Sequence, residues 1–536
     1  MRARAYGLGA KPARVQASGY RCRVVAMTSV VTSSAVGTDL AAEQPQGAGL
    51  RRTARRHRAV LWLPALLVLG LGFLGLDRRS VWRDEAASLV AVDRSLPELW
   101  AMLTQVESVH AVYYTFLHVW LRLGDGEVWA RVPSVLAMAV AAGLLAVVGA
   151  RLVSVPVGLV AGLLFAVNPS VSFYAQEARS TALVSAFALL ATWLLLRSVE
   201  RRQRWWVGYA LVCAVLVGLN LLALLVPVAH GVALLLWRRR RALLPWAVAT
   251  VPAVLVAVVL GVVAGRQPYQ IGWIPEPGIS SVRDFVLLAL GPNLVVAGLV
   301  AGLVLVAVLP TRDERVRRLR ALALPLAALP SVVLVLVSFA HPIFVPRYVF
   351  PSAAAVSLLA ATGVVRLGTL VATRTGGRAV AVVAAAAVLA VGVGGIGTQR
   401  LDRTAASRPD DLAAAARVVA AGARPGDALL FLPSNRRLVA LVYPRAFAGL
   451  RDIGLSETPV EADNLMGRRL PLPVVLQNIS TCDRVWALGR PGLALQPVDR
   501  DARTELDLLQ REFEAVPYTD AHGVGITLFV RRTATS

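Results

Sequence analysis

Long apolar runs alternate with short arginine-rich segments along most of the chain. The runs have the length of about 17–25 residues that an α-helix needs to cross the hydrocarbon core of a bilayer. The run over 205–237 is too long for one span and is interpreted as two helices joined near Gly218–Asn220. The pattern therefore predicts eleven membrane-spanning helices. The runs lie at about 59–76, 132–150, 155–171, 180–197, 205–237, 242–264, 292–309, 321–340, 348–366 and 379–397.

One further apolar run, Val112–Leu123, is too short to span a bilayer and carries His118 in its middle. Its Tyr and Trp residues suit the membrane interface, so we predict an interfacial helix within a first outer loop, 77–131. With this loop outside, the inner loops hold 17 arginines and the outer loops hold ten. Because arginine is enriched in cytoplasmic loops, we expect the N-terminus inside and the residues after about 398 outside.

The two ends of the chain differ from the middle. Residues 1–58 are polar and basic and are predicted to be a disordered cytoplasmic tail, with Met1 or Met27 as its start. Residues 59–397 form the predicted transmembrane domain, and 398–536 a small extracytoplasmic α/β domain. The elements expected in that domain are helices at Asp411–Gly422 and Thr504–Ala515 and strands at Asp427–Leu432, Arg484–Leu488 and Gly525–Arg531.

Composition supports a membrane protein. Hydrophobic residues make up 57% of the chain and charged residues 16%, which excludes a disordered or ordinary soluble chain. The net charge of +24 rests on arginine, since Lys11 is the only lysine, and the arginines lie between apolar runs. That distribution follows membrane topology, so no nucleic-acid partner is expected. The three scattered cysteines form neither a disulfide framework nor a metal-binding spacing.

The first outer loop holds most of the candidate chemistry. Asp84 and Glu85 directly follow the first span, and a carboxylate desolvated near lipid is a stronger general base. The alternative is a solvated helix start, where acids are favourable. His110, in the same loop, is a base, a ligand or an interfacial polar side chain. Tyr113 and Tyr114 follow it in the chain.

Two further outer loops carry charged residues. Glu177 and Arg179 lie where two apolar runs meet, and they either pair with each other or line a pocket. Arg347 and Tyr348 lie on a short outer turn, where a guanidinium suits a lipid phosphate or anchors the helix at the interface. The sequence has no P-loop, dinucleotide-binding, GxSxG or HExxH motif, which argues against a nucleotide-driven pump or a familiar soluble hydrolase.

Four segments in order resemble the GT-C glycosyltransferases, which include the family 39 protein O-mannosyltransferases and the lipid A aminoarabinose transferases. The resemblance covers about residues 60–365, and the tail resembles the extracytoplasmic domain of actinobacterial members described as mannosyltransferases. Two positions depart from the family pattern: a His-Pro-Pro of many relatives is His110-Ala111-Val112, and a tyrosine of the second loop is Thr181. The four segments are RDEAASL, HAVYYTFLHVWLRLGDGEVWARVPS, NPSVSFYAQEARSTAL and PRYVFPSAAAVSLLA.

The resemblance implies a polytopic GT-C fold in a bacterial, actinobacterial-type plasma membrane. It also implies transfer of a sugar, mannose by the family's habit, from a polyprenyl-phosphate donor to a glycan, lipid or protein acceptor, with inversion. Asp84 would then be the base, and the donor phosphate would be bound by Arg179, Arg347 and Tyr348. Glu85 and Glu177 would orient the acceptor or hold a divalent metal ion, which some relatives use. The remaining acceptor-orienting candidates are His110, Tyr113 and Tyr114.

Two other interpretations stay open. A lipid-linked glycan ligase of the same fold would use a diphosphate-linked donor. A secondary transporter or flippase would be expected to have ionisable residues at mid-membrane and repeat symmetry. The acids of this chain gather at the predicted outer ends of the spans, which favours the enzyme.

Overall fold

The computed structural model of the chain describes residues 60–200, 204–267, 274, 276, 278–375, 378–491, 499–518 and 521–532. The predicted N-terminal tail, 1–58, lies outside these residues. All described residues belong to one compact unit, Thr53–Ser536.

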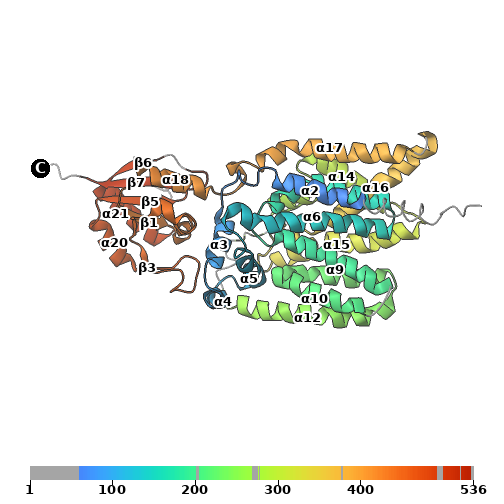
Figure 1. Cartoon of the computed structure of the whole chain (residues 1–536), viewed down its shortest axis with the longest axis horizontal. Coiled ribbons are helices and arrows are strands. Elements are labelled where there is room, and N and C mark those ends of the chain that lie inside the picture. Colours follow the sequence, from blue (N-terminus) through green and yellow to red (C-terminus); the bar gives the residue numbers. More distant parts are fainter. Residues whose placement is uncertain are drawn as a thin grey trace, which may run out of the picture. The chain divides into compact units, whose positions relative to one another are not determined.

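Each of the eleven predicted spans coincides with helical structure, and Figure 1 shows the long helices running side by side. Among the described residues, six helices are long and apolar enough to cross a membrane singly, or eight if the bent pairs α7–α8 and α13–α14 count as one span each. The chain is a multi-pass membrane protein. Its membrane region consists of α2 (Leu63–Phe73), α6 (Gly126–Leu152), α7 (Val155–Val167), α8 (Pro169–Ala175), α9 (Thr181–Glu200), α10 (Arg204–Leu219), α11 (Leu225–Leu236), α12 (Arg240–Ala264), α13 (Ile279–Leu290), α14 (Leu294–Val308), α15 (Glu314–Ser338), α16 (Ser352–Thr375) and α17 (Ala379–Leu401).

Local chemistry explains where these helices break and how they pack. The predicted break in 205–237 is confirmed: α10 ends at Leu219, and the Asn220 side chain accepts a hydrogen bond from the Leu222 N–H at 2.9 Å. Such a cap lets a new helix begin. Glycine brings neighbouring helices close together, because a Cβ at Gly158 of α7 would collide with the α6 backbone.

The first loop forms short helices, as predicted for Val112–Leu123. These are α3 (Arg83–Val92), α4 (Leu96–Gln105), the single 3₁₀ turn η2 (Ser108–His110) and α5 (Ala111–Trp120). A helix of ten residues rises only ~15 Å, half of the hydrocarbon core, so α5 cannot span it. Its end is tied to the start of α6, since the Trp120 and Trp129 rings stack with centroids 4.6 Å apart.

The C-terminal region is an α/β domain, as predicted. Five of its seven described strands form one sheet in the order β2-β1-β5-β7-β6, with β1 parallel to β2 and β5, and β7 antiparallel to its neighbours. Strands β3 (Leu455–Glu457) and β4 (Arg468–Arg469) form a separate pair. Figure 1 shows the helices around the sheet. The sheet strands and helices are β1 (Ala428–Leu432), β2 (Arg451–Asp452), β5 (Arg484–Gly489), β6 (Phe513–Pro517), β7 (Gly525–Arg531), α18 (Leu412–Gly422), α19 (Leu438–Val442), α20 (Leu472–Ser480) and α21 (Arg500–Glu512).

The predicted bounds of the helix at Thr504–Ala515 are partly wrong. α21 begins earlier, at an Asp499 cap that accepts the Ala502 N–H, and it ends at Glu512. The residues after it form β6, because Phe513 is buried in the domain core and the chain pairs with β7. Charged residues continue from α21 into β6 without a glycine or proline, so the sequence does not mark where the helix ends.

The C-terminal domain packs directly on α3. Asp410 accepts hydrogen bonds from the backbone N–H and the Nε of Arg83, both at 2.9 Å. Val81 and Ala86 belong to the same buried apolar cluster as α18 and β1. The domain therefore fixes the helix on which the two predicted catalytic carboxylates lie.

Candidate active site

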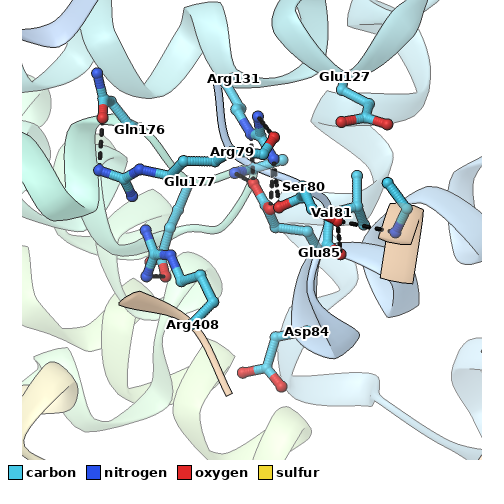
Figure 2. Close-up of polar contacts among 12 residues, drawn as sticks. Arg79, Ser80, Val81, Asp84, Glu85, Glu127, Arg131, Gln176, Glu177 and Arg408 are labelled. Atoms are coloured by element: carbon cyan, nitrogen blue, oxygen red, sulfur yellow. Dashed lines mark hydrogen bonds and ion pairs between the residues drawn. The ribbon is translucent and has the colours of Figure 1, made fainter. Parts of the chain in front are cut away.

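Asp84 and Glu85 lie in the first turn of α3, the next helix after α2. Trp82 before them is extended, and both acids face the helix N-terminus, where negative charge is favourable. Successive helix residues point about 100° apart, so the two carboxylates enter different surroundings. Figure 2 shows the Asp84 side chain pointing away from the Glu85 side chain. Asp84 retains a side-chain exposure of 20%, whereas Glu85 is buried.

Asp84 forms an ion pair with Arg347. The Arg347 Nη1 donates to Asp84 Oδ2 at 2.7 Å, across 263 residues of sequence. Arg347 lies on the 3₁₀ turn η5 (Pro346–Val349) before α16, and its guanidinium lies 5.6 Å from the Tyr348 ring centroid. The structure thus brings a carboxylate, a guanidinium and a tyrosine from two predicted outer loops to one place.

Arg179 joins the same cluster from the loop between α8 and α9. Its Nη1 donates to the Asp84 carbonyl at 3.2 Å, to Ser88 Oγ at 3.3 Å and to the Tyr114 hydroxyl at 3.3 Å. Its Nη2 lies 3.2 Å from His110 Nε2. Two arginines therefore flank Asp84, one at its carboxylate and one at its backbone.

His110 and Glu107 form the far side of the cluster. Burial, together with the charges of Arg179 and Arg347, holds the pKa of His110 well below its usual value, so the ring is neutral at pH 7. Arg179 can only donate, so His110 Nε2 accepts. Glu107 accepts the Tyr114 hydroxyl at 3.0 Å and has a left-handed backbone with φ of 60°. Strain of this kind is found where a site over-determines its geometry.

Glu85 is held by Arg131 of α6 in a buried, two-pronged ion pair. Arg131 Nε and Nη2 each donate to one Glu85 oxygen at 2.9 Å, and both side chains are nearly inaccessible. The remaining Arg131 hydrogens bind backbone carbonyls of the segment that leads into α3, as Figure 2 shows in part. These carbonyls belong to Leu76, Arg79 and Ser80.

Glu85 also holds the loop that carries Arg179. Its Oε1 accepts the Ala178 N–H at 2.9 Å. Burial alone would raise the pKa of Glu85, but the charge and hydrogen bonds of Arg131 outweigh it and bring the pKa below its usual value. Glu85 is therefore an ionised positioning residue, which fixes α3 and the Arg179 loop against each other.

Glu177 pairs with Arg408, and among the described residues it forms no ion pair with Arg179. Arg408 lies in the segment that leads from α17 to the C-terminal domain, and its guanidinium stacks 3.5 Å from the Phe173 ring centroid. The neighbouring Gln176 accepts a hydrogen bond from Arg79 (Figure 2) and donates to the last carbonyls of α2. The second loop is thus fastened to both α2 and the C-terminal segment.

The structure brings most of the predicted site residues together and places the others elsewhere. The cluster around Asp84 contains six of the nine, whereas Glu85 and Glu177 lie in buried ion pairs and Tyr113 is buried beside Tyr114. No role was predicted for Arg131 or Arg408, whose partners lie 46 and 231 residues away. The six clustered residues are Asp84, His110, Tyr114, Arg179, Arg347 and Tyr348.

The arrangement does not fit the metal site considered for Glu85 and Glu177. Each carboxylate is already paired with its own buried arginine, Glu85 with Arg131 and Glu177 with Arg408. Within the described residues, no group of three or more His, Cys, Asp or Glu could hold a metal ion. We therefore derive no step through a metal.

Comparison with solved structures shows which fold the chain has. ArnT from Cupriavidus metallidurans in the apo state matches over 90% of this chain and 98% of its own, with a TM-score of 0.54 and 16% identity. The same protein bound to undecaprenyl phosphate matches with a TM-score of 0.51, at the same identity and coverage. The chain has the GT-C fold. Its residues 111–264 match the family described as dolichyl-phosphate-mannose-protein mannosyltransferase. No protein of curated function matches the chain by sequence.

The GT-C fold confirms the expected architecture: a polytopic helical domain followed by a small α/β domain. The family match begins at α5 and ends at the last residue of α12. It therefore includes Tyr113, Tyr114, Glu177 and Arg179, but neither Asp84 nor Arg347. The two halves of the central ion pair lie on either side of the matched segment.

Proposed function

We propose that the chain is a membrane glycosyltransferase that transfers a sugar from a polyprenyl-phosphate donor to an acceptor on the outer side of a bacterial plasma membrane. The observation that carries the proposal is the contact of the Asp84 carboxylate with the Arg347 guanidinium within a GT-C fold. A base beside a phosphate-binding cation is what such a transfer needs. The family match of residues 111–264 favours mannose as the sugar. The ArnT complex with undecaprenyl phosphate favours a polyprenyl-phosphate donor.

Asp84 acts as the general base in this proposal. The acceptor hydroxyl gives its proton to the Asp84 carboxylate while its oxygen attacks the anomeric carbon of the donor sugar. The bond from that carbon to the phosphate oxygen breaks, and the polyprenyl phosphate leaves with the electron pair. Attack from the face opposite the phosphate inverts the anomeric configuration.

Arg347 connects the base to the leaving group. In the ligand-free arrangement its Nη1 is bound to Asp84, and a donor phosphate would compete for the same guanidinium. Binding of the phosphate would release the Asp84 carboxylate for the acceptor hydroxyl, so donor binding would switch on the base. The leaving phosphate gains one negative charge, which Arg347 and Arg179 stabilise more in the transition state than in the ground state.

The lipid part of the donor needs an apolar path beside Arg347. A narrow cavity of about 30 Å³ reaches Tyr348 between α9, α11, α15 and α16, and its other lining residues are mainly apolar. This volume is too small for a prenyl chain, so helices must separate for one to enter. We propose that the first isoprene units of the donor lie there.

The test is the variant Asp84→Asn, which keeps the shape of the side chain and removes its basicity. With a polyprenyl-phosphate mannose donor, we expect transfer to fall ~10²–10⁴-fold, the usual value of general-base assistance. Donor binding should persist, since Arg347 is retained and freed from its carboxylate partner. Asp93→Asn, an exposed acid at the other end of α3, is the matched control and should transfer normally.

Near wild-type transfer by Asp84→Asn would show that Asp84 is not the general base. A diphosphate-linked donor, supplied in parallel, separates this enzyme from a lipid-linked glycan ligase. Transfer from the diphosphate-linked donor alone would favour the ligase.

A further inference from the structure

A second lipid-facing feature lies apart from the candidate active site. It is a groove of about 620 Å³ between α2 and α17, with the end of α7 at its floor. Its walls are apolar and its only charged lining residues are three arginines at one end, among the residues that the structure describes. The apolar lining is Leu67, Leu71, Leu74, Val167, Val388, Leu389, Gly392, Val393 and Ile396, and the arginines are Arg78, Arg400 and Arg403.

The three arginines form a cationic rim. Arg403 is fixed to the end of α2, because its Nε donates to the Leu74 carbonyl at 2.9 Å and its Nη2 to the Leu71 carbonyl at 2.8 Å. The stems of Arg78 and Arg403 both pack over Gly75, where a Cβ would lie 3.2 and 3.5 Å from their Cδ atoms. Within the described part of the chain, neither Arg78 nor Arg400 makes an ion pair or a side-chain hydrogen bond.

One carboxylate, Asp402, acts on this rim, but only in part. It is next to Arg403 in sequence, is buried, and shares its charge among Arg79, Arg408 and Arg403. Arg78 and Arg400 are exposed. Two unpaired guanidinium groups beside a third, above an apolar groove, are complementary to a phosphate group that carries a hydrocarbon chain.

The length of the groove decides which lipid fits. The α17 residues that line it run from Val388 to Arg400, a rise of ~18 Å at 1.5 Å per residue. One leaflet of the hydrocarbon core is ~15 Å thick, half of the bilayer core. A fatty acyl chain matches that depth, whereas a polyprenyl chain of many isoprene units is several times longer.

We propose that this groove is a binding site for one anionic glycerophospholipid of the surrounding leaflet. Its acyl chain lies between α2 and α17, and its phosphate lies against Arg78, Arg400 and Arg403. The lipid would cover the open face of α17 and join the first and last membrane helices. The site is distinct from the donor path at Tyr348 and does not depend on the proposed function.

Two glycines of α17 provide a matched test. A Cβ at Gly392 would meet only the Val167 side chain, at 3.8 Å, so Gly392→Leu fills the groove without a backbone clash. Gly397 lies on the same helix, does not line the groove and has open space around it, so Gly397→Leu is the control. The double variant Arg78→Gln/Arg400→Gln removes the unpaired charges and leaves the groove open.

The experiment is native mass spectrometry of the purified chain in neutral detergent, with phosphatidylglycerol or phosphatidylcholine added. The two arginines favour the headgroup with a net negative charge, so we expect the wild type to prefer phosphatidylglycerol about tenfold or more. The arginine double variant should lose this preference. Gly392→Leu should retain neither lipid, and Gly397→Leu should behave as the wild type.

Three results would overturn the proposal. Equal binding of the two phospholipids by the wild type would exclude an anionic-lipid site. Displacement of phosphatidylglycerol by equimolar undecaprenyl phosphate would assign the groove to a polyprenyl lipid. If the wild type formed a dimer and Gly392→Leu dissociated it, the groove would be assigned to a second copy of the chain.

Discussion

Replacing Glu85 by glutamine would leave Arg131 as a buried cation without a counter-charge. Both side chains are about 1–2% exposed, so solvent cannot take the place of the lost carboxylate. Breaking a buried ion pair by removing one partner typically costs ~3–5 kcal/mol. Arg131 would keep its three backbone carbonyls, and the glutamine oxygen could accept one hydrogen bond, so we expect the lower end of this range.

The same substitution should reduce activity without removing the base. Glu85 Oε1 holds the Ala178 N–H, and the next residue, Arg179, supports the Asp84 backbone. Loss of this anchor lets the Arg179 loop move away from the leaving phosphate. Glu85→Gln should therefore lower kcat by less than Asp84→Asn does, because the Asp84 carboxylate is retained.

The assay is thermal unfolding of purified protein in detergent, combined with transfer kinetics. The pKa of Glu85 is lowered on folding, so its stabilisation is complete above the unfolded value of ~4.3 and is lost as pH falls through the folded pKa. The difference in Tm between wild type and Glu85→Gln should thus shrink below about pH 4.

A double-mutant cycle with Arg131→Met measures the pair itself. Contacting residues give interaction free energies of ~0.5–3 kcal/mol, so the double variant should be less destabilised than the sum of the singles. Additive losses, or a Glu85→Gln variant with wild-type Tm, would refute the buried-pair argument. A loss of transfer as large as that of Asp84→Asn would identify Glu85 as the base instead of Asp84.

Two further predictions concern the donor and the topology. Arg347→Lys should weaken donor use several-fold or more, because an ammonium replaces a planar fork that can hold phosphate, and Arg347→Ala should be worse; unchanged donor affinity in the alanine variant would exclude Arg347 from phosphate binding. In a chain whose native cysteines are replaced by serine, a cysteine at the exposed Ser480 should react with an impermeant thiol reagent in intact spheroplasts, and one at the exposed Arg312 should not; the reverse labelling would invert the membrane orientation.

The membrane region could be predicted from sequence because each span is a local signal. Run length located the helices, and the short run Val112–Leu123 was distinguished from a span by length and the arginine count alone. The break at Asn220 also had a local cause, a side chain that caps the next turn. The bends were not predicted: α7 and α8 meet at 66° at Asn168, where the side chain caps Ser170 and Pro169 begins the new helix.

The candidate site was only half predictable, for a physical reason. The sequence identified Asp84, Arg179 and Arg347 as charged residues at the ends of apolar runs, and the structure places them together. The sequence alone could not predict which acidic residue pairs with which arginine, because helix packing brings together partners that lie far apart in the sequence. Glu85 was expected to orient the acceptor or hold a divalent metal ion, and the structure places it in a buried ion pair with Arg131.

The arginine excess has two structural uses in this chain. Arg238 to Arg241 in a predicted inner loop are exposed, as expected for residues that set membrane orientation. In contrast, Arg79, Arg131 and Arg408 are buried at 1–4% exposure near the candidate site. Several of their N–H groups bind main-chain carbonyls, which a lysine with three clustered donors could not reach together.

The buried arginines make the C-terminal segment part of the site. Arg408 neutralises Glu177, and Asp410 binds both the backbone and the side chain of Arg83, next to Asp84. A chain that ended after α17 would keep every membrane helix but would leave Glu177 as an unpaired buried carboxylate and Arg83 without its partner. Because an unpaired buried charge costs several kcal/mol, the α3 helix and the second loop would shift apart. The C-terminal domain therefore supports the Asp84 geometry through charges, whatever else it binds.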